Sequence, residues 1–131
     1  MERPLPSTDE ERFDIISLSL VLNYVPDATG RGEMLRRTTQ FLRGQGGTKV
    51  FPCLFLVLPA PCVTNSRYMD ESHLTSIMAS LGYNLLYRKI TAKLVYHLWF
   101  YDSAAKVNKR AFSKKEINPG KTRNNFCVVL R

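Results

Sequence analysis

The 131-residue sequence has few cysteines, and none of them is spaced as in a zinc site. Cys53, Cys62 and Cys127 form no Cys-x-x-Cys pair, and neither histidine stands at a ligand-like spacing from them. An odd number of cysteines set among apolar residues also argues against a disulfide framework. We therefore expect no bound metal and three reduced thiols in an intracellular protein.

Long apolar runs are also absent. No run approaches the roughly 18–20 residues that span a bilayer, so we expect no membrane partner. Residues 1–12 lack the apolar h-region of a secretory signal and are interpreted as a leader. With 44% hydrophobic and 23% charged residues, the sequence is typical of one globular domain.

Acidic residues are scarce near the carboxyl terminus. Residues 1–102 hold 11 Lys and Arg against 10 Asp and Glu, whereas residues 103–131 hold 8 against 1. Nearly all of the net charge of +8 therefore lies in the last 29 residues. This asymmetry predicts a globular core with a basic extension that faces a polyanion.

The first half of the sequence predicts a strand followed by a helix. Residues 12–25 form a nearly continuous apolar run, typical of a parallel strand covered on both faces, which Pro26 would end. Asp27 is placed to cap a helix over about residues 31–43. The apolar face of that helix is expected to contain Met34, Leu35, Thr38, Phe41 and Leu42.

The second half predicts another strand and helix, then a pair of strands. Residues 53–63 are apolar and closed by prolines, and Asp70 is placed to cap a helix that Gly82 would end. Residues 84–102 indicate two short strands with a turn near residues 91–93, and residues 125–130 indicate a last short strand. The buried face of the second helix is expected to contain Leu74, Ile77, Met78 and Leu81.

Alternating strands and helices predict an α/β fold, with a parallel sheet and helices outside it. Ligands of such sheets bind at the carboxyl ends of the strands, which places residues 23–27 and 58–65 at the functional edge. Gly30 and Gly32 do not form a dinucleotide fingerprint, because Leu35 stands where a third glycine is needed. Residues 44–49 contain Gly-Thr-Lys in the wrong order for a Walker loop.

Several segments resemble one enzyme family. These are "DIISLSLVLNYVPDATGRGEMLRRTTQFL", "LPAPCVTNSRYM" and "NPGKTRNNF". They resemble the fungal nucleolar large-subunit (25S) rRNA adenine-N1 methyltransferases, which are class I enzymes dependent on S-adenosyl-L-methionine. The resemblance covers nearly the whole chain and implies a nucleolar location.

The resemblance implies that the chain corresponds to the carboxyl-terminal half of such an enzyme. The implied fold is half of a Rossmann-like sheet, with a domain over residues 13–102 and a basic extension over residues 103–131. The family's Gly-rich cofactor loop and its ribose-binding acid would precede the matched segment. Residues 15–22 would then form an open, apolar sheet edge, so we expect poor solubility, self-association or partial unfolding.

The resemblance also implies a methyl-acceptor site after the first strand. It assigns catalytic positions to Asn23, Tyr24 and Pro26, and a cofactor contact to Ser19. Asn23 would bond an adenine edge, and Tyr24 would stack on the base. The alternatives are that Asn23 caps the loop backbone, that Tyr24 fills the sheet edge and that Ser19 is a small packing residue.

The basic extension is the expected rRNA contact. Phe112 and Phe126 are interleaved with its cations, as in many RNA-binding segments. The alternative interpretation of this extension is a disordered basic tail. Outside the extension, His97 is expected to be a half-buried strand histidine. As a whole the chain is either part of an rRNA methyltransferase, or a non-enzymatic RNA-binding remnant or S-adenosylmethionine-sensing relative. The expected RNA-binding residues are Lys109, Arg110, Lys114, Lys115, Lys121 and Arg123.

Overall fold

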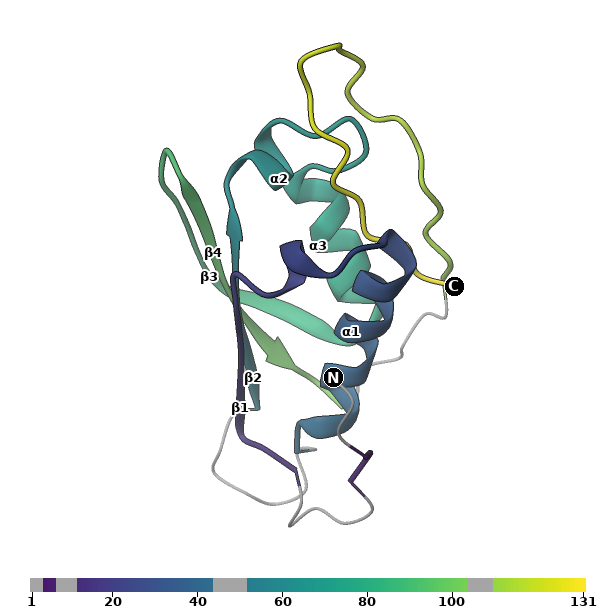
Figure 1. The fold of residues 1–131 in the computed structure, drawn as a ribbon. Coiled ribbons are helices and arrows are strands. Elements are labelled where there is room, and N and C mark those ends of the chain that lie inside the picture. The colour runs from purple at the N-terminus through teal and green to yellow at the C-terminus, as the bar shows by residue number, and fades with distance from the viewer. Residues whose placement is uncertain (1–3, 7–11, 44–51, 104–109) are drawn as a thin grey trace.

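The computed structural model describes residues 4–6, 12–43, 52–103 and 110–131 (Figure 1). One mixed sheet has the strand order β1-β2-β4-β3, with β1 Ile15–Ser19, β2 Cys53–Pro59, β3 Tyr83–Ile90 and β4 Leu94–Tyr101. The helices are the 3-10 helix η2 Leu22–Tyr24, α1 Ala28–Phe41, α2 Pro61–Thr64 and α3 Glu71–Ser80. The predicted α/β class is confirmed, but the predicted parallel sheet is wrong in part, because β4 runs antiparallel to both of its neighbours.

The sheet topology places the carboxyl ends of three strands at the same end of the sheet. β1 pairs with β2 in parallel, and β4 runs antiparallel to both β2 and β3. β3 is therefore parallel to β1 and β2, and the predicted hairpin near residues 91–93 folds β4 into the gap between β2 and β3. Helices α1 and α3 lie on the same side of the sheet (Figure 1). When two right-handed β-α-β connections advance in the same direction across a sheet, their helices lie on the same face.

The first strand differs from its prediction in length and burial. It ends at Ser19 rather than at Pro26, because Leu20 takes a φ of 57° and turns the chain out of the ladder. Its parallel pairing is confirmed, but burial on both faces is wrong: Ile15 is 65% exposed and only Leu18 is buried. β1 is one of the two edge strands of the sheet that the described residues form.

The predicted helix caps are confirmed. Asp27 accepts a hydrogen bond from the Gly30 backbone N–H, so α1 begins at Ala28 rather than near residue 31. Gly30 and Gly32 consequently lie inside the helix. Asp70 accepts from the His73 N–H at 2.7 Å and begins α3. No helix in the described ranges combines the length and apolarity that crossing a membrane requires.

The predicted helix faces are also confirmed, because both pack against the sheet. Fully buried side chains of this core are Leu35, Thr38, Phe41, Leu42, Leu74, Ile77 and Met78. Leu81 is buried as well, and Gly82 ends α3 with a φ of 100°. Met34 packs at the margin of the same cluster.

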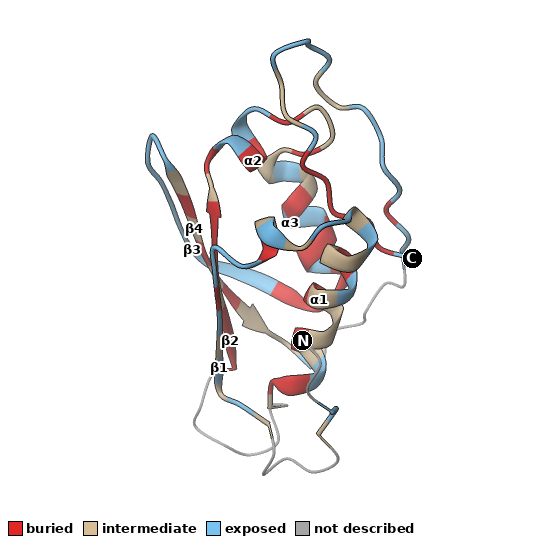
Figure 2. Ribbon diagram, viewed as in Figure 1, coloured by how far each residue is buried: buried red, intermediate tan, exposed pale blue. Residues whose placement is uncertain are grey.

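The carboxyl-terminal segment, residues 110–131, packs onto the domain. The predicted strand over residues 125–130 is wrong, because the segment makes only isolated bridges, Ser66 to Asn124 and Phe112 to Leu130. Figure 2 shows a buried stretch near its end, where residues 126–130 are all buried. The alternative of a disordered tail is therefore wrong for these residues. They complete the core beside α1.

Candidate functional site

An open pocket of about 530 Å³ lies at the carboxyl ends of β1 and β2. Its volume is within the range of small-ligand sites. The residues that line it come from three stretches that are far apart in the sequence. They are Asn23, Pro26, Ala28 and Arg31 after β1, Pro59 and Cys62 at the end of β2, and Lys114, Asn124, Asn125, Phe126 and Cys127 from the carboxyl-terminal segment.

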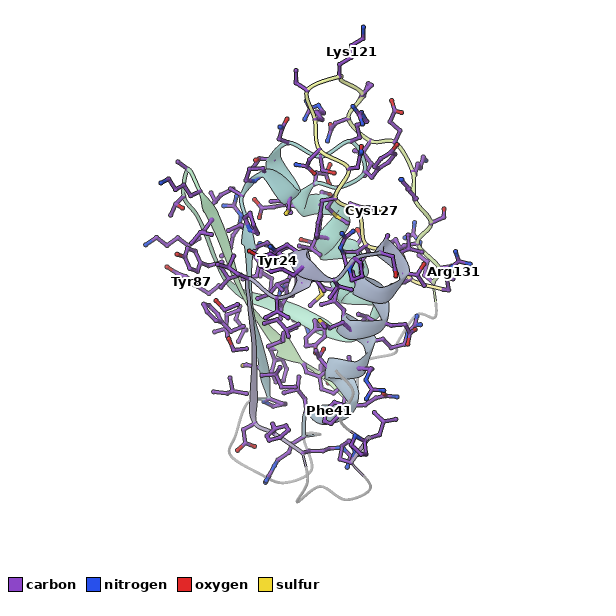
Figure 3. The ribbon with its side chains drawn as sticks, in the orientation of Figure 1. Tyr24, Phe41, Tyr87, Lys121, Cys127 and Arg131 are labelled. Carbon is purple, nitrogen blue, oxygen red and sulfur yellow. The ribbon has the colours of Figure 1, made fainter. Side chains whose placement is uncertain are left out.

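The structure brings two of the three predicted catalytic residues together. Asn23 and Pro26 both line the pocket. Tyr24 does not, and it is 80% exposed, so the alternative that it fills the sheet edge is wrong (Figure 3). Ser19 is the exposed last residue of β1, so it is not a packing residue among the described residues.

Asn23 carries a buried oxygen without a partner. Its Oδ1 atom accepts no hydrogen bond from any described residue. It therefore does not cap the loop, whose turn is closed by backbone bonds from Tyr24 N–H to Val21 C=O at 3.0 Å and from Val25 N–H to Leu22 C=O at 3.2 Å. An unpaired buried acceptor costs about 1–3 kcal/mol. A ligand that donates a hydrogen bond to Asn23 would recover this free energy.

Arg31, in the first turn of α1, binds the carboxyl-terminal segment where that segment forms one wall of the pocket. Its Nη1 donates to the Cys127 C=O at 2.8 Å, and its guanidinium carbon lies 4.8 Å from the centroid of the Phe126 ring. Its Nε is buried without a partner within the described ranges. Sequence reasoning missed Arg31, because no local pattern distinguishes it from the other arginines of the helix.

The pocket is cationic. Arg31 and Lys114 are in its lining, and none of the described lining residues is acidic. The Lys114 Nζ also lies 4.3 Å from the centroid of the Tyr68 ring. Burial raises the pKa of the Cys62 thiol to about 11, so this residue is a neutral thiol and not a nucleophile. The lining therefore favours an electron-rich or anionic ligand.

Two of the family-like segments meet beside the pocket. The loop between α2 and α3, residues 65–67, binds residues 117–125, and we call these two stretches the clasp. Arg67 N–H donates to Asn124 C=O at 3.0 Å, and Asn124 N–H donates to Asn65 C=O at 2.9 Å. The Asn124 Nδ2 donates to Pro61 C=O at 2.8 Å. Both segments carry the family resemblance, but neither contains a sequence pattern that predicts that they pair.

The predicted RNA-binding residues are spread over the clasp and the segment before it. Lys109 lies outside the described residues. The side chain of Lys114 reaches the pocket lining, whereas Lys121 stands at the outer end of the clasp, away from the sheet (Figure 3). Arg123 is partly buried, and the exposed residues are Arg110, Lys114, Lys115 and Lys121.

His97 lies outside this pocket and is more buried than predicted. It is 1% exposed, and its Nε2 lies 3.1 Å from a Glu71 carboxylate oxygen. Arg88 donates two hydrogen bonds of 2.6 Å to the same carboxylate. Within the described chain, no group of three or more His, Cys, Asp or Glu is placed to hold a metal ion.

Comparison with known proteins agrees with the predicted resemblance. The chain matches the family "25S rRNA (adenine(2142)-N(1))-methyltransferase, Bmt2" over residues 1–128. It is 40% identical over 131 residues to the 25S rRNA (adenine(2142)-N(1))-methyltransferase of Saccharomyces cerevisiae (strain ATCC 204508 / S288c), covering 99% of this chain and 37% of that protein. It is 42% identical over 120 residues to the 25S rRNA adenine-N(1) methyltransferase of Schizosaccharomyces pombe (strain 972 / ATCC 24843), covering 92% of this chain and 43% of that protein. The chain thus spans about two-fifths of the length of these relatives.

Proposed function

Because the chain belongs to the family of 25S rRNA (adenine(2142)-N(1))-methyltransferases, Bmt2, we propose that it forms the adenosine-binding and RNA-contacting part of an enzyme that methylates adenine N1 in large-subunit rRNA. One observation carries this proposal. Asn23, whose buried Oδ1 has no partner among the described residues, is one of the residues that line a cationic pocket at the carboxyl ends of β1 and β2, where α/β proteins bind ligands.

Asn23 has the chemistry to recognise adenine. Its Oδ1 would accept a hydrogen bond from the exocyclic amino group, next to N1, after the base has left its stack. Methylation at N1 places positive charge on the ring and makes that amino group a stronger donor. The hydrogen bond would therefore strengthen toward the transition state, which is the condition for an interaction to accelerate a reaction.

The other predicted residues support the same arrangement. Tyr24, which is 80% exposed, is available to stack on a base. Pro26 lines the pocket just before the cap of α1 and restricts the backbone there. N1 carries its own lone pair, so the reaction needs positioning of the base and no protein nucleophile.

The described residues fit one side of a cofactor site. S-adenosyl-L-methionine, when bound, would supply the methyl group. Ser19 is exposed at the open edge of β1, followed by Leu20 and Val21, which are 38% and 42% exposed. We propose that this surface faces the cofactor and that the sheet is the carboxyl-terminal half of a Rossmann-like sheet. No described lining residue of the pocket is an acid that would hold a ribose.

The cations of the carboxyl-terminal segment are the proposed rRNA contact. Arg110 and Lys114 each lie over an aromatic ring, with the Arg110 guanidinium carbon 4.9 Å from the Phe112 centroid. Such cations would neutralise phosphates and make binding dependent on salt. With rRNA as substrate, the proposed location is the nucleolus.

A chimera tests the proposed function. This chain would replace the matching segment of the Saccharomyces cerevisiae relative, and N1-methyladenosine in large-subunit rRNA would be measured by mass spectrometry of nucleosides. We expect the chimera to methylate, and Asn23→Ala to lower the rate about 100-fold because a group aimed at the reacting base is lost. Asn84→Ala, which alters an exposed asparagine of β3, is the matched control and should leave the rate unchanged.

Two results would count against this proposal. A folded chimera without activity would exclude the enzymatic role and, if the chain still bound RNA, would support a non-enzymatic RNA-binding module. Equal rates for Asn23→Ala and Asn84→Ala would exclude the assigned site.

A further inference from the structure

The Arg67 side chain donates hydrogen bonds to the exposed loop of the clasp, residues 118–123, and to Asn125 just after it. Its Nε donates to Gly120 C=O at 2.9 Å, its Nη2 donates to Lys121 C=O at 3.4 Å, and its Nη1 donates to Asn125 Oδ1. Its own backbone C=O accepts hydrogen bonds from the N–H groups of residues 117 and 118 at 2.7 and 3.0 Å. Both ends of the loop are therefore bound to one residue that lies more than 50 positions earlier in the sequence.

The clasp carries three cations and no acidic residue. All acceptors of the Arg67 guanidinium are neutral, and residues 65–67 and 117–125 include no Asp or Glu. Lys121 is exposed, and the Arg123 side chain lies along Gly120, where a Cβ would be 3.3 Å from its Nε. Like charges on one short stretch repel one another, and a polyanion would offset that repulsion.

The loop is continuous with the pocket. Asn124 and Asn125 belong to the clasp and also line the pocket, so the loop begins where the pocket wall ends. An RNA strand with one nucleotide in the pocket would pass over residues 118–123. Lys121 and Arg123 would then meet the phosphates next to that nucleotide.

We propose that Arg67 is a positioning residue that preforms the loop 118–123 as a phosphate-binding surface for the RNA strand beside the target adenosine. Arg67 itself contacts protein groups, and its fork of donors fixes the loop before RNA arrives. A preformed loop binds more tightly because less conformational entropy is lost on association. This inference rests on the proposed function, since RNA is the ligand that it assumes.

The experiment measures binding of the chain to a short fluorescein-labelled single-stranded RNA with one central adenine. Fluorescence anisotropy at several salt concentrations gives the affinity and its salt slope. The variants are Arg67→Ala, Arg67→Lys and the double variant Lys121→Ala/Arg123→Ala. The double variant Lys89→Ala/Lys93→Ala removes the same charge from exposed positions on the β3–β4 hairpin and is the matched control.

We expect the loop double variant to weaken binding about tenfold and to reduce the salt slope by about 1.4, as for two lost phosphate contacts on single-stranded RNA. Arg67→Ala should have a similar effect, and adding it to the loop double variant should weaken binding little further. Arg67→Lys keeps the charge but not the fork of donors, so it should resemble Arg67→Ala. The hairpin control should change the slope far less.

The inference is wrong if the loop double variant binds as the wild type does, or if the hairpin control loses as much affinity. It is also wrong if Arg67→Lys, with an unchanged melting temperature, retains full affinity. Since Lys121 is exposed and Arg123 is partly exposed, the loop variant tests the proposed phosphate contact even if Arg67→Ala fails to fold. A wild-type chain that binds no RNA would overturn the inference and the RNA contact of the proposed function together, whereas the chimera tests methylation independently.

Discussion

Gly32 and Val129 are in direct backbone contact: a Cβ at position 32 would lie 1.8 Å from the Val129 carbonyl oxygen. The Val129 N–H also donates to the Ala28 C=O at 3.0 Å. The carboxyl-terminal segment therefore lies directly on the first turns of α1. The contact lies two residues after Cys127, which lines the pocket and is labelled in Figure 3.

Replacement of Gly32 by alanine should destabilise the protein by about 3 kcal/mol, because one backbone must move away from the other. Urea denaturation would measure the change in the free energy of unfolding. Glu33→Ala, on the exposed side of the same helix turn, should change it by less than about 0.5 kcal/mol. A Gly32→Ala variant as stable as the wild type would show that the two segments are not in contact.

Thr38 and Tyr83 should be energetically coupled. Their hydroxyl oxygens are 2.5 Å apart in the core, and Thr38 also donates to the Leu35 C=O at 2.6 Å. Tyr83→Phe would leave Thr38 without its buried donor and should cost about 1–2 kcal/mol. A double-mutant cycle with Thr38→Val should give a coupling free energy of about 1 kcal/mol. Tyr87→Phe, at a 58% exposed tyrosine, is the matched control and should be neutral.

Stability should decrease as the pH falls below neutrality. Burial lowers the pKa of His97 below its usual 6.5, so the unfolded chain binds this proton more readily and stability is lost below about pH 6.5. The hydrogen bond from Arg88 lowers the pKa of Glu71, whose contribution is lost below about pH 4.5. Urea midpoints across this range should fall first with His97 and then with Glu71.

His97→Gln should flatten the upper part of that pH profile. His73 contributes in the same direction, because burial also lowers its pKa, and His73→Gln removes that share. A wild-type midpoint that is constant between pH 7 and 5 would contradict both assignments.

The open edge of β1 should cause self-association of this chain. Ile15 is 65% exposed on an edge strand whose outer side has no partner among the described residues. Sedimentation velocity should show dimers or larger species, and Ile15→Lys should shift the population toward monomer. Thr29→Lys adds the same charge on exposed α1 and should not. A monodisperse wild-type monomer that melts cooperatively would refute this prediction.

Local patterns explain what could be predicted of the fold. Asp27, Asp70 and Gly82 act on backbone groups within a few residues, so their caps were predictable. Helical spacing likewise predicts which faces are buried. The length of β1 was not predictable, because Leu20 takes its positive φ where the chain leaves the ladder with β2.

The candidate site was predictable only in part. Asn23 and Pro26 follow a predicted strand, and the family resemblance assigned both of them to the catalytic site. Arg31 and Arg67 carry no such mark, because their partners lie 96 and 53–58 positions away in the sequence. The pairing of the two stretches of the clasp could likewise not be predicted, because neither stretch has a periodic sequence pattern.

The amino-acid sequence alone was enough to predict the class of the fold, the capping residues of the helices, the charge of the carboxyl-terminal segment and the family. These follow from interactions between near neighbours in the chain and from residue identity. That residues 110–131 pack onto the domain and form a wall of the pocket, rather than extend as a tail, became clear only from the folded structure. That outcome depends on close backbone approach at Gly32 and on long-range hydrogen bonds from Arg31 and Arg67, which exist only when distant segments have met.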